Sequence, residues 1–465
     1  MERINPATGE SLDPIEADDD AAVEDALADA ESAFVEWRGV PITERQALVE
    51  DAASVLRENE EEYAALMTEE MGKPLDSARA EVEKCAWVCE YYAERAAEHL
   101  QDERVGSEAK AETFVSYEPL GPVLAVMPWN FPFWQVFRFA APHLTAGNVG
   151  LLKHASNVPG CARAIEEVFR EAGYPEGVFQ SLLVGSDAVA EVIADERVKA
   201  VTLTGSERAG RSVAADAGAE LKKTVLELGG SDPFVVLDDA DVAAAAATGT
   251  IARTLNSGQS CIAAKRFVVH TDVYDEFVEA FVAEMEALTV GDPTDSGTDV
   301  GPQARADLLD TLHDQVERSV EAGATVETGG EPLDRQGFFY PPTVLTDVPA
   351  DAAVATEEVF GPVAAVFAVD DEAEAIAVAN DTNLGLGGSV WTEDVARGKR
   401  VARRIDSGAV FVNELTKSDP RLPFGGIGDS GYGRELGRDG IREFVNRKTV
   451  WVQDAEPPED GPATE

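Results

Sequence analysis

Short apolar segments of strand length alternate with longer segments of helical periodicity over most of this chain, and this alternation limits its possible folds more than any other feature. Ten strands are predicted at residues 115–117, 122–127, 149–153, 177–183, 198–204, 224–228, 233–237, 266–270, 363–367 and 409–413. Strands that alternate with helices are typical of a parallel sheet covered by helices on its faces. The sequence therefore predicts the α/β class.

The first hundred residues are predicted to be mostly helical. Apolar residues recur at three- and four-residue spacing over residues 21–37, 42–71 and 75–100. Cys85 and Cys89 lie on the last of these segments, four residues apart. They lack the further ligands that a metal site needs, so we interpret them as buried core residues.

Domain boundaries are suggested by local composition. The small residues at 229–231 separate the first set of strands from the second, and a chain of 465 residues is too long for one core. The segment 449–453 has a β-type pattern after the last helix. Residues beyond 454 are rich in proline and acidic residues, which predicts a disordered tail.

The charge of the chain is strongly negative. Its 88 acidic residues against 38 basic ones give a formal net charge of −50, and the acidic residues are dispersed along the chain. Such a charge argues against binding to nucleic acid or to an anionic membrane. Because salt screens self-repulsion, we hypothesise a salt-rich cytoplasm, as in a halophile. The four cysteines are too few for a disulfide framework, and no apolar segment has the length of a signal peptide or membrane span, so we expect a cytoplasmic protein.

Three side chains are candidates for chemistry. Cys261 follows a small polar loop, which gives a nucleophilic thiol partial exposure and space, although a cysteine in a loop can also be inert. Glu227 ends an apolar strand; burial would make it a general base, whereas a strand end facing solvent would leave it ordinary. Asn130 either caps a helix predicted over residues 132–144 or donates its amide to an oxyanion.

A second group of residues suggests nucleotide binding. Gly205 and Ser206 end a strand and open a helix, an arrangement that binds pyrophosphate at the helix N-terminus. Lys153 ends another strand, where it could contact a ribose or face solvent. Residues 205–212 also approach a phosphate-binding loop of nucleotide hydrolases, but Arg211 replaces the required lysine. The five histidines show no metal-ligand spacing, so no metal is expected.

Taken together, these motifs and their order resemble the aldehyde dehydrogenase superfamily over nearly the whole chain. The matching segments are Pro128-Trp129-Asn130-Phe131-Pro132, Lys153, Thr204-Gly205-Ser206, Glu227-Leu228-Gly229-Gly230, Gly258-Gln259-Ser260-Cys261, Glu357-Glu358-Val359-Phe360-Gly361-Pro362 and Pro423-Phe424-Gly425-Gly426. Several motifs in one order are more specific than any one of them. The resemblance implies NAD(P)-dependent oxidation of an aldehyde.

The resemblance also implies a role for each matching residue. Cys261 would attack the aldehyde, the Asn130 amide and the Cys261 N–H would form the oxyanion hole, and Glu227 would activate the water that hydrolyses the thioester. The residues implied in cofactor binding are Trp129, Lys153, Ser156, Gly205, Ser206, Glu358 and Phe360.

The architecture implied by the resemblance is a Rossmann-like cofactor-binding domain, an α/β catalytic domain and a small β oligomerisation extension. The cofactor domain would comprise residues 1–100 and 120–229, the catalytic domain 230–429, the extension 101–119 and 446–457, and the disordered tail 458–465. An exposed β-prone segment in an acidic chain would be a liability if unpaired, so we expect a homodimer or homotetramer.

Cofactor preference is predicted from the position three residues after Lys153. Members that prefer NAD commonly carry a glutamate there that binds the adenosine ribose, and here the residue is Ser156. The absence of that carboxylate removes repulsion of a 2′-phosphate. We therefore expect that both NADP and NAD are accepted, with NADP favoured.

The substrate is predicted from residues 153–157 and 229–234, which resemble the succinate-semialdehyde dehydrogenase branch. Arg138 matches an arginine that binds the substrate carboxylate in that branch, although an ion pair within the protein is the alternative. A second arginine of some members is replaced by Leu255, and the loop 417–421 could supply a substitute. Another aldehyde, or a binding protein without catalysis on this fold, remain the competing interpretations.

Overall fold

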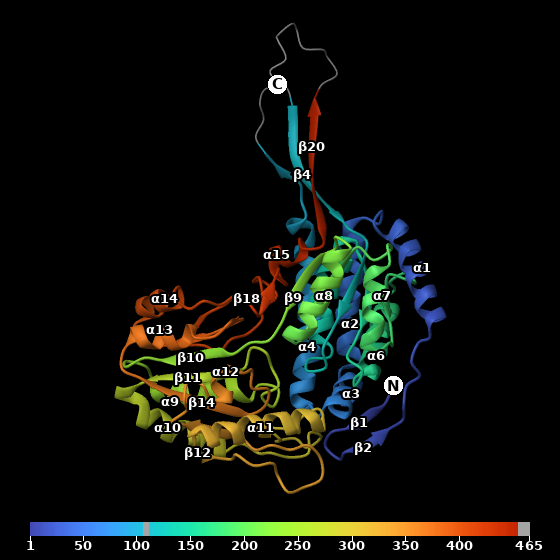
Figure 1. Cartoon of the computed structure of the whole chain (residues 1–465). Coiled ribbons are helices and arrows are strands. Elements are labelled where there is room, and N and C mark those ends of the chain that lie inside the picture. The colour runs from blue at the N-terminus through green and yellow to red at the C-terminus, as the bar shows by residue number, and fades with distance from the viewer. Residues whose placement is uncertain (106–110, 454–465) are drawn as a thin grey trace.

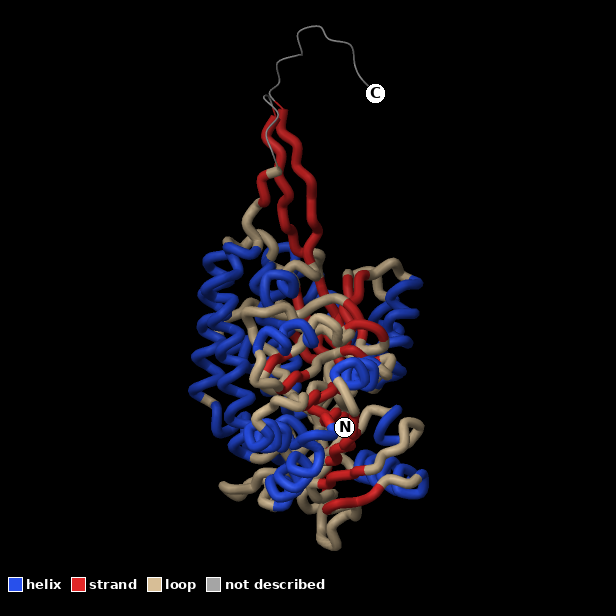
Figure 2. Tube along the Cα trace, turned by 90° about the vertical axis from the view of Figure 1, so that its left-hand side faces the viewer, coloured by secondary structure: helices blue, strands red, loops and turns tan. Residues whose placement is uncertain are grey.

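The computed structural model describes residues 1–105 and 111–453. In this part of the chain, two sheets of mostly parallel strands lie side by side and a narrow arm projects from the body (Figure 1). Figure 2 shows the strands of the arm running together away from a body in which helices surround the sheets. The prediction of an α/β fold is confirmed.

The N-terminal helices cover the first sheet. They are α1 (Asp20–Trp37), α2 (Ile42–Glu58), α3 (Glu60–Met71) and α4 (Leu75–His99), and a small hairpin of β1 (Arg3–Asn5) and β2 (Glu10–Leu12) precedes them. The segment predicted as one helix over residues 42–71 is broken at Asn59, whose backbone leaves the helical region and whose side chain donates to the carbonyl of Val55 at 3.0 Å. Cys85 and Cys89 are fully buried on α4, as interpreted from the sequence.

The first sheet has the strand order β19-β9-β8-β5-β6-β7. Its strands are β5 (Pro122–Val126), β6 (Val149–Lys153), β7 (Phe179–Ser181), β8 (Ala200–Thr204), β9 (Lys223–Glu227) and β19 (Gly431–Tyr432). Its connecting helices are α5 (Trp134–Ala146), α6 (Pro159–Glu171), the 3₁₀ turn η1 (Ser186–Ala188), α7 (Val189–Ala194) and α8 (Glu207–Ala219). β5 to β9 are parallel, so their carboxyl ends meet at one edge of the sheet.

The second sheet has the order β12-β13-β14-β11-β10-β16-β17. Its strands are β10 (Asp232–Val236), β11 (Ala264–His270), β12 (Thr325–Thr328), β13 (Thr343–Thr346), β14 (Val363–Val369), β16 (Ser389–Trp391) and β17 (Phe411–Val412). Its helices are α9 (Val242–Thr254), α10 (Thr271–Glu286), α11 (Ala306–Ala322), α12 (Ala353–Thr356), α13 (Glu372–Asn380) and α14 (Val395–Ala402). The boundary expected at residues 229–231 falls between β9 and β10, the last strand of one sheet and the first of the other.

The chain returns to the first sheet near its end. A short pair of β15 (Leu384–Gly385) and β18 (Ile427–Gly428) precedes β19, which joins β9 in antiparallel orientation, and α15 (Gly437–Ile441) follows. Residues 430–445, which the sequence left unassigned, thus belong to the first layer and bring Glu435 next to α5.

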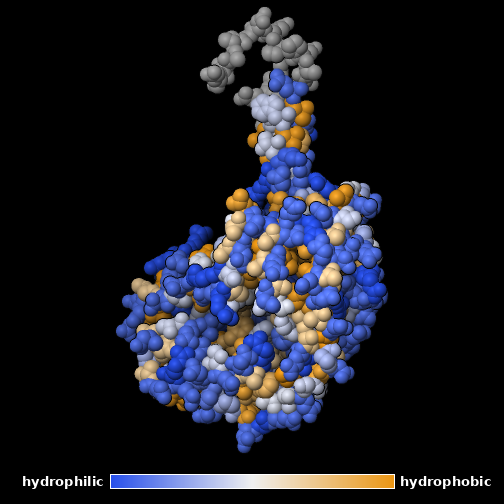
Figure 3. All heavy atoms as spheres, turned by 45° about the vertical axis from the view of Figure 1, so that its right-hand side comes forward, coloured by the Kyte–Doolittle hydropathy of each residue, from blue (hydrophilic) through white to orange (hydrophobic). Residues whose placement is uncertain are grey.

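The arm consists of β3 (Glu103–Arg104), β4 (Ala111–Pro119) and β20 (Val445–Gln453). β20 pairs with β4 over its whole length, from Val445 opposite Pro119 to Gln453 opposite Ala111. The surface is mostly hydrophilic, but hydrophobic atoms lie exposed along the arm (Figure 3), where Trp451 keeps 66% of its surface accessible. The tail predicted to be disordered lies outside the described residues.

Candidate functional site

Two cavities meet at Cys261. One, of about 230 Å³, lies between α4, α5 and the loop at residues 415–418. The other, of about 380 Å³, lies at the carboxyl ends of β5, β6 and β8 and at the start of α8. Cys261 lines both, so a molecule in either cavity can contact the thiol.

The loop before Cys261 has an unusual backbone. Asn256, Ser257 and Gly258 all have positive φ, with values of 56°, 56° and 76°. A Cβ on Gly258 would lie 2.2 Å from the carbonyl carbon of Gly361, so only glycine fits there. Runs of strained residues persist where surrounding structure holds them, often at functional sites.

Buried cations hold this loop in place. The Arg253 guanidinium donates to the carbonyl of Gly258 at 2.7 Å. The Lys265 ammonium, fully buried on β11, donates to the carbonyl of Ser260 at 2.8 Å and to that of Cys261. Sequence reasoning missed Lys265, although a lysine four residues after the cysteine in an apolar strand was a visible signal.

Asn130 lies beside the nucleophile loop and does not cap α5. Its side-chain nitrogen donates to the backbone carbonyl of Gln259 at 3.1 Å, and its backbone carbonyl accepts from the Asn256 side chain at 2.6 Å. An amide group has two hydrogens, so one remains available to a ligand. Asn130 and Cys261 line the same cavity, as the oxyanion interpretation requires.

α5 begins two residues later than predicted and is capped from a distant helix. The carboxylate of Glu81 on α4 accepts from the backbone N–H groups of Phe133 and Trp134, both at 2.9 Å. Glu81 also forms a buried ion pair with Lys73. No local sequence signal identifies such a cap, because its donor and acceptor are about fifty residues apart.

Burial dominates the ionisation of the thiol. It raises the pKa of Cys261 to about 12, while the positive charges of Lys265 and Arg138 oppose this rise. Near neutral pH the resting side chain is therefore a thiol, and its proton must leave as a bond to sulfur forms.

Glu227 is buried at the end of β9 and lines neither cavity, although the next residues, Leu228 and Gly229, line the larger one. Neither carboxylate oxygen has a hydrogen-bond partner among the described residues. Burial raises the pKa of Glu227 well above its usual range, and the nearby Glu435 raises it further. A Cβ on Gly425 would lie 2.6 Å from one carboxylate oxygen, so glycine leaves room for this side chain.

Arg138 already has a carboxylate partner. Its guanidinium forms a buried ion pair with Glu435, donates to Thr204 at 3.3 Å and lies 4.7 Å from the ring centre of Phe424. It also lines the smaller cavity. The ion pair within the protein, which the sequence left open as the alternative, is therefore present, and the binding of a substrate carboxylate by Arg138 stays a prediction.

The candidate cofactor residues gather around the second cavity. It is lined by Trp129, Lys153, Gly205, Ser206, Glu358 and Phe360. Ser156 lies in an adjoining cavity of about 760 Å³, whose lining Lys153 also joins. The rings of Trp129 and Phe360 pack nearly perpendicular to each other, with their centres 5.8 Å apart. All seven residues predicted from the sequence thus border one continuous region.

Charges around this cavity suit a dinucleotide. Ser206 caps α8 by accepting from the N–H of Ala209 at 3.3 Å, and the remaining N-terminal N–H groups of the helix can face a phosphate. Glu358 accepts from the N–H of Gly230 at 3.0 Å and lies 3.6 Å from the Lys265 ammonium. These groups would bind the pyrophosphate and the nicotinamide ribose, and they fit an NAD(P) cofactor.

A phosphate-binding loop is not formed at residues 205–212. α8 already begins at Glu207, so most of this segment is helical, and the Arg211 guanidinium pairs with Asp429 at 2.8 Å. Within the described residues, no group of three or more His, Cys, Asp or Glu side chains is arranged to hold a metal ion. None of the helices in those residues has the length and apolarity needed to cross a membrane.

Comparison with known proteins assigns the family. The sequence profile of the Aldehyde dehydrogenase family matches residues 1–450. The chain belongs to this family. It is an NAD(P)-dependent aldehyde dehydrogenase, which confirms the activity implied by the sequence resemblance.

Several relatives are similar over nearly their full length. A probable succinate-semialdehyde dehydrogenase [NADP(+)] of Synechocystis is 55% identical over 97% of this chain and 99% of its own. A succinate-semialdehyde dehydrogenase [NADP(+)] of Mycobacterium avium is 54% identical over 97% of this chain and 96% of its own. The crystal structure of a Streptococcus pyogenes succinic semialdehyde dehydrogenase in complex with NADP+ is 39% identical, with a TM-score of 0.95 over 97% of this chain and all of that one.

Proposed function

We propose that this aldehyde dehydrogenase oxidises succinate semialdehyde to succinate, with NADP favoured over NAD. The observation that carries the proposal is the position of Cys261 at the junction of two cavities, one bordered by dinucleotide-binding groups and the other by cationic side chains. The names of the two succinate-semialdehyde dehydrogenases described above point to the same substrate and cofactor.

The first half of the proposed mechanism belongs to Cys261 and Asn130. The thiol gives its proton to solvent water as its sulfur forms a bond to the aldehyde carbon, and the carbonyl oxygen gains negative charge. The Asn130 amide and the Cys261 N–H donate to that oxygen, which stabilises the charge as it develops. A bound NADP would supply the acceptor for the hydride of this carbon, and Cys261 would then hold the acyl group as a thioester.

The second half belongs to Glu227. Its carboxylate removes a proton from water, the water oxygen attacks the thioester carbon, and the carbon–sulfur bond breaks to release the acid and the thiol. A buried carboxyl with a raised pKa is well suited to accept that proton. It is protonated at low pH, so we expect deacylation to slow as the pH falls.

Steady-state kinetics test the substrate and the cofactor separately. We expect kcat/KM for succinate semialdehyde to exceed that for butanal, which has the same chain length without the carboxylate, at least about tenfold. We also expect NADP to be used better than NAD, and Ser156→Glu to reverse that preference by repelling the 2′-phosphate. Equal use of butanal would contradict the substrate, and a strong preference of the unmodified enzyme for NAD would contradict the cofactor.

A further inference from the structure

Four cationic side chains line the smaller cavity beside Cys261. They are Lys73, Lys84, Arg138 and Lys417. The apolar residues of the same wall include Phe131, Trp134, Leu255, Ile262 and Phe424. A cavity with this lining suits a short aliphatic chain that ends in an anion, because the walls bury the chain and the cations attract the charge.

Three of these four cations already have a carboxylate partner within the protein. Lys73 pairs with Glu81, and Arg138 pairs with Glu435, both in the interior. Lys417 pairs with Glu414 at 2.7 Å, and about half of its side chain is exposed. Each of these charges is compensated before any ligand arrives, which weakens its attraction for a substrate anion.

Lys84 is different. Among the described residues no carboxylate lies within ion-pair distance of its ammonium group. Its Nζ donates to the Ser418 hydroxyl at 2.8 Å and lies 4.4 Å from the ring centre of Trp134. A hydroxyl and an aromatic face stabilise an ammonium only in part, so a partly buried cation held in this way still favours an anion.

We propose that Lys84 binds the carboxylate of the substrate and is a specificity-determining residue of this enzyme, an inference that rests on the proposed oxidation of succinate semialdehyde. Ser418 and Trp134 hold the ammonium at the cavity wall, and the substrate supplies the carboxylate that the protein lacks. The sequence suggested that the loop 417–421 supplies a cation in place of the arginine that Leu255 replaces. In the structure, the cation without a carboxylate partner among the described residues is Lys84 on α4.

The ionisation of Lys84 agrees with this role. Burial and the adjacent positive charge of Arg138 lower its pKa to about 8, while Cys85, Glu81 and Asp419 act in the opposite direction. The other titratable groups facing it are Lys73, Lys417 and Cys261 around the cavity. Above about pH 8 the free enzyme would therefore lose the charge that attracts the substrate.

Arg138 and Lys84 are expected to have separable effects. The positive charge of Arg138 lowers the pKa of both Glu227 and Cys261. Loss of Arg138 would therefore change the reaction with any aldehyde. Lys84 has no such influence on Glu227. Its loss would act on carboxylated substrates alone.

The test compares Lys84→Met with the wild type on succinate semialdehyde and on butanal. Methionine retains most of the side-chain volume but removes the charge. We expect KM for succinate semialdehyde to rise about tenfold to hundredfold, the range of a hydrogen bond to a charged group, with kcat/KM for butanal unchanged. Lys84→Arg should retain the preference, and Lys417→Met is the matched control, because it removes a lysine of the same cavity that already has a partner.

Each result has a distinct meaning. A wild type that uses both aldehydes equally well overturns the proposed substrate, whatever the variants do. A wild type that prefers succinate semialdehyde, with Lys84→Met keeping that preference, overturns the role of Lys84 alone. Equal losses on both aldehydes also overturn it, because they would show a structural role.

A second measurement uses the unmodified enzyme and does not depend on the folding of a variant. Ionisation of Cys261 and Glu227 affects both reactions equally. Its effect therefore cancels in the ratio of kcat/KM for succinate semialdehyde to kcat/KM for butanal. We expect this ratio to fall as the pH rises through about 8 to 9, because the ammonium becomes neutral. A ratio that stays constant from pH 7 to 10, where arginine keeps its charge, would assign the carboxylate to Arg138.

Discussion

At the scale of single residues, the site combines groups that are buried without conventional partners. Glu227 is enclosed with both oxygens unsatisfied among the described residues, and Glu435 lies close enough to raise its pKa further. Arg138 compensates only part of this negative charge because it also pairs with Glu435. A buried carboxyl group without hydrogen-bond partners destabilises the fold. Such destabilising groups are typical of catalytic positions.

Substitution of Glu227 by glutamine tests its role in hydrolysis. We expect one equivalent of reduced cofactor per active site in a rapid burst, followed by a steady-state rate about 10²- to 10⁴-fold lower, since acylation proceeds without the base and deacylation does not. Stopped-flow absorbance and the mass of the acylated protein measure the two parts. Normal steady-state turnover, or no burst, would contradict the assignment, and Cys261→Ala should give neither burst nor turnover.

At the scale of elements, the arm projects from the body of the molecule and leaves one strand edge exposed. β20 pairs with β4 along its whole length and forms one edge of the sheet, while β3 pairs with β4 on the other side. Trp451 and Val452 are exposed there. A long strand edge with exposed apolar side chains is a template for pairing with another chain, so we propose that the arm forms the interface of a homodimer or homotetramer.

A charged residue at the exposed tryptophan tests the arm. We expect Trp451→Asp to shift the protein to a smaller assembly, because an aspartate would be buried without a partner at the interface. Light scattering coupled to size-exclusion chromatography measures the mass, and Asn446→Ala on the same strand is the control. An unchanged mass for Trp451→Asp would place the subunit interface elsewhere.

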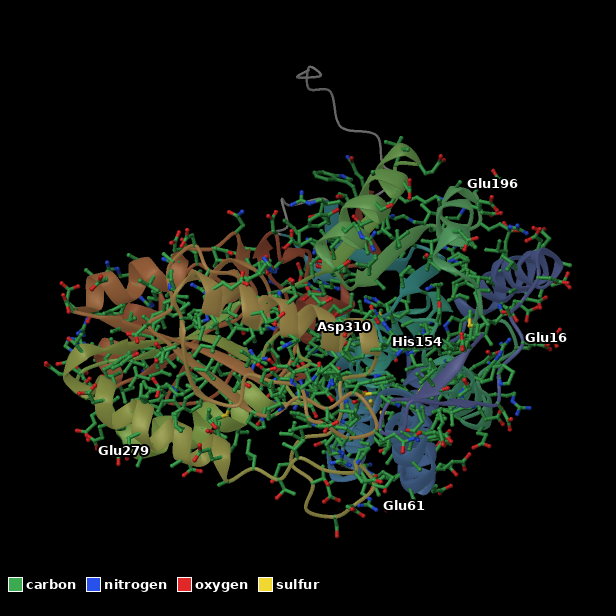
Figure 4. All side chains as sticks on the ribbon, turned by 60° about the horizontal axis from the view of Figure 1, so that its bottom comes forward. Glu16, Glu61, His154, Glu196, Glu279 and Asp310 are labelled. Carbon is green, nitrogen blue, oxygen red and sulfur yellow. The ribbon has the colours of Figure 1, made fainter. Side chains whose placement is uncertain are left out.

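At the scale of the whole molecule, the charge of −50 is spread over the surface. Exposed acidic residues lie around the periphery in Figure 4, among them Glu61 on α3, Glu279 on α10, and Glu16 and Glu196 in loops. Many surface arginines pair with more than one carboxylate, as Arg57 does with Glu83 and Glu90, and the acidic residues still greatly outnumber them. Self-repulsion of this size favours expansion unless salt screens it.

The salt dependence of stability follows from that repulsion. The distance over which charges interact falls from about 10 Å at 0.1 M salt to about 3 Å at 1 M. We expect Tm to rise by more than about 4 °C between dilute buffer and 2 M KCl, equivalent to about 4 kcal/mol for a chain of this length. Glycine betaine at equal osmolarity is the uncharged control. Full activity and an unchanged Tm in salt-free buffer would contradict the hypothesis of adaptation to salt.

The sequence by itself determined the α/β class of the fold and the residues proposed for catalysis and cofactor binding. Alternating apolar segments predict parallel strands because periodicity is a local property, and the strand ends at Lys153, Thr204 and Glu227 follow from it. Dispersed acidic residues likewise predict an acidic surface without any coordinates. The loop before Cys261 was recognisable from its small polar residues, although its three successive positive φ values were not.

Only the tertiary structure decided which charges are compensated. Glu81 caps a helix from another element, Arg138 pairs with Glu435 almost three hundred residues later, and Lys84 has no carboxylate partner among the described residues. Burial and ion pairing depend on which segments pack together. When two partners are far apart in the chain, their positions in the sequence do not show that they are in contact. The nucleophile could therefore be predicted from the residues around Cys261 in the sequence. Which cation is free to bind a substrate carboxylate could not be predicted in this way.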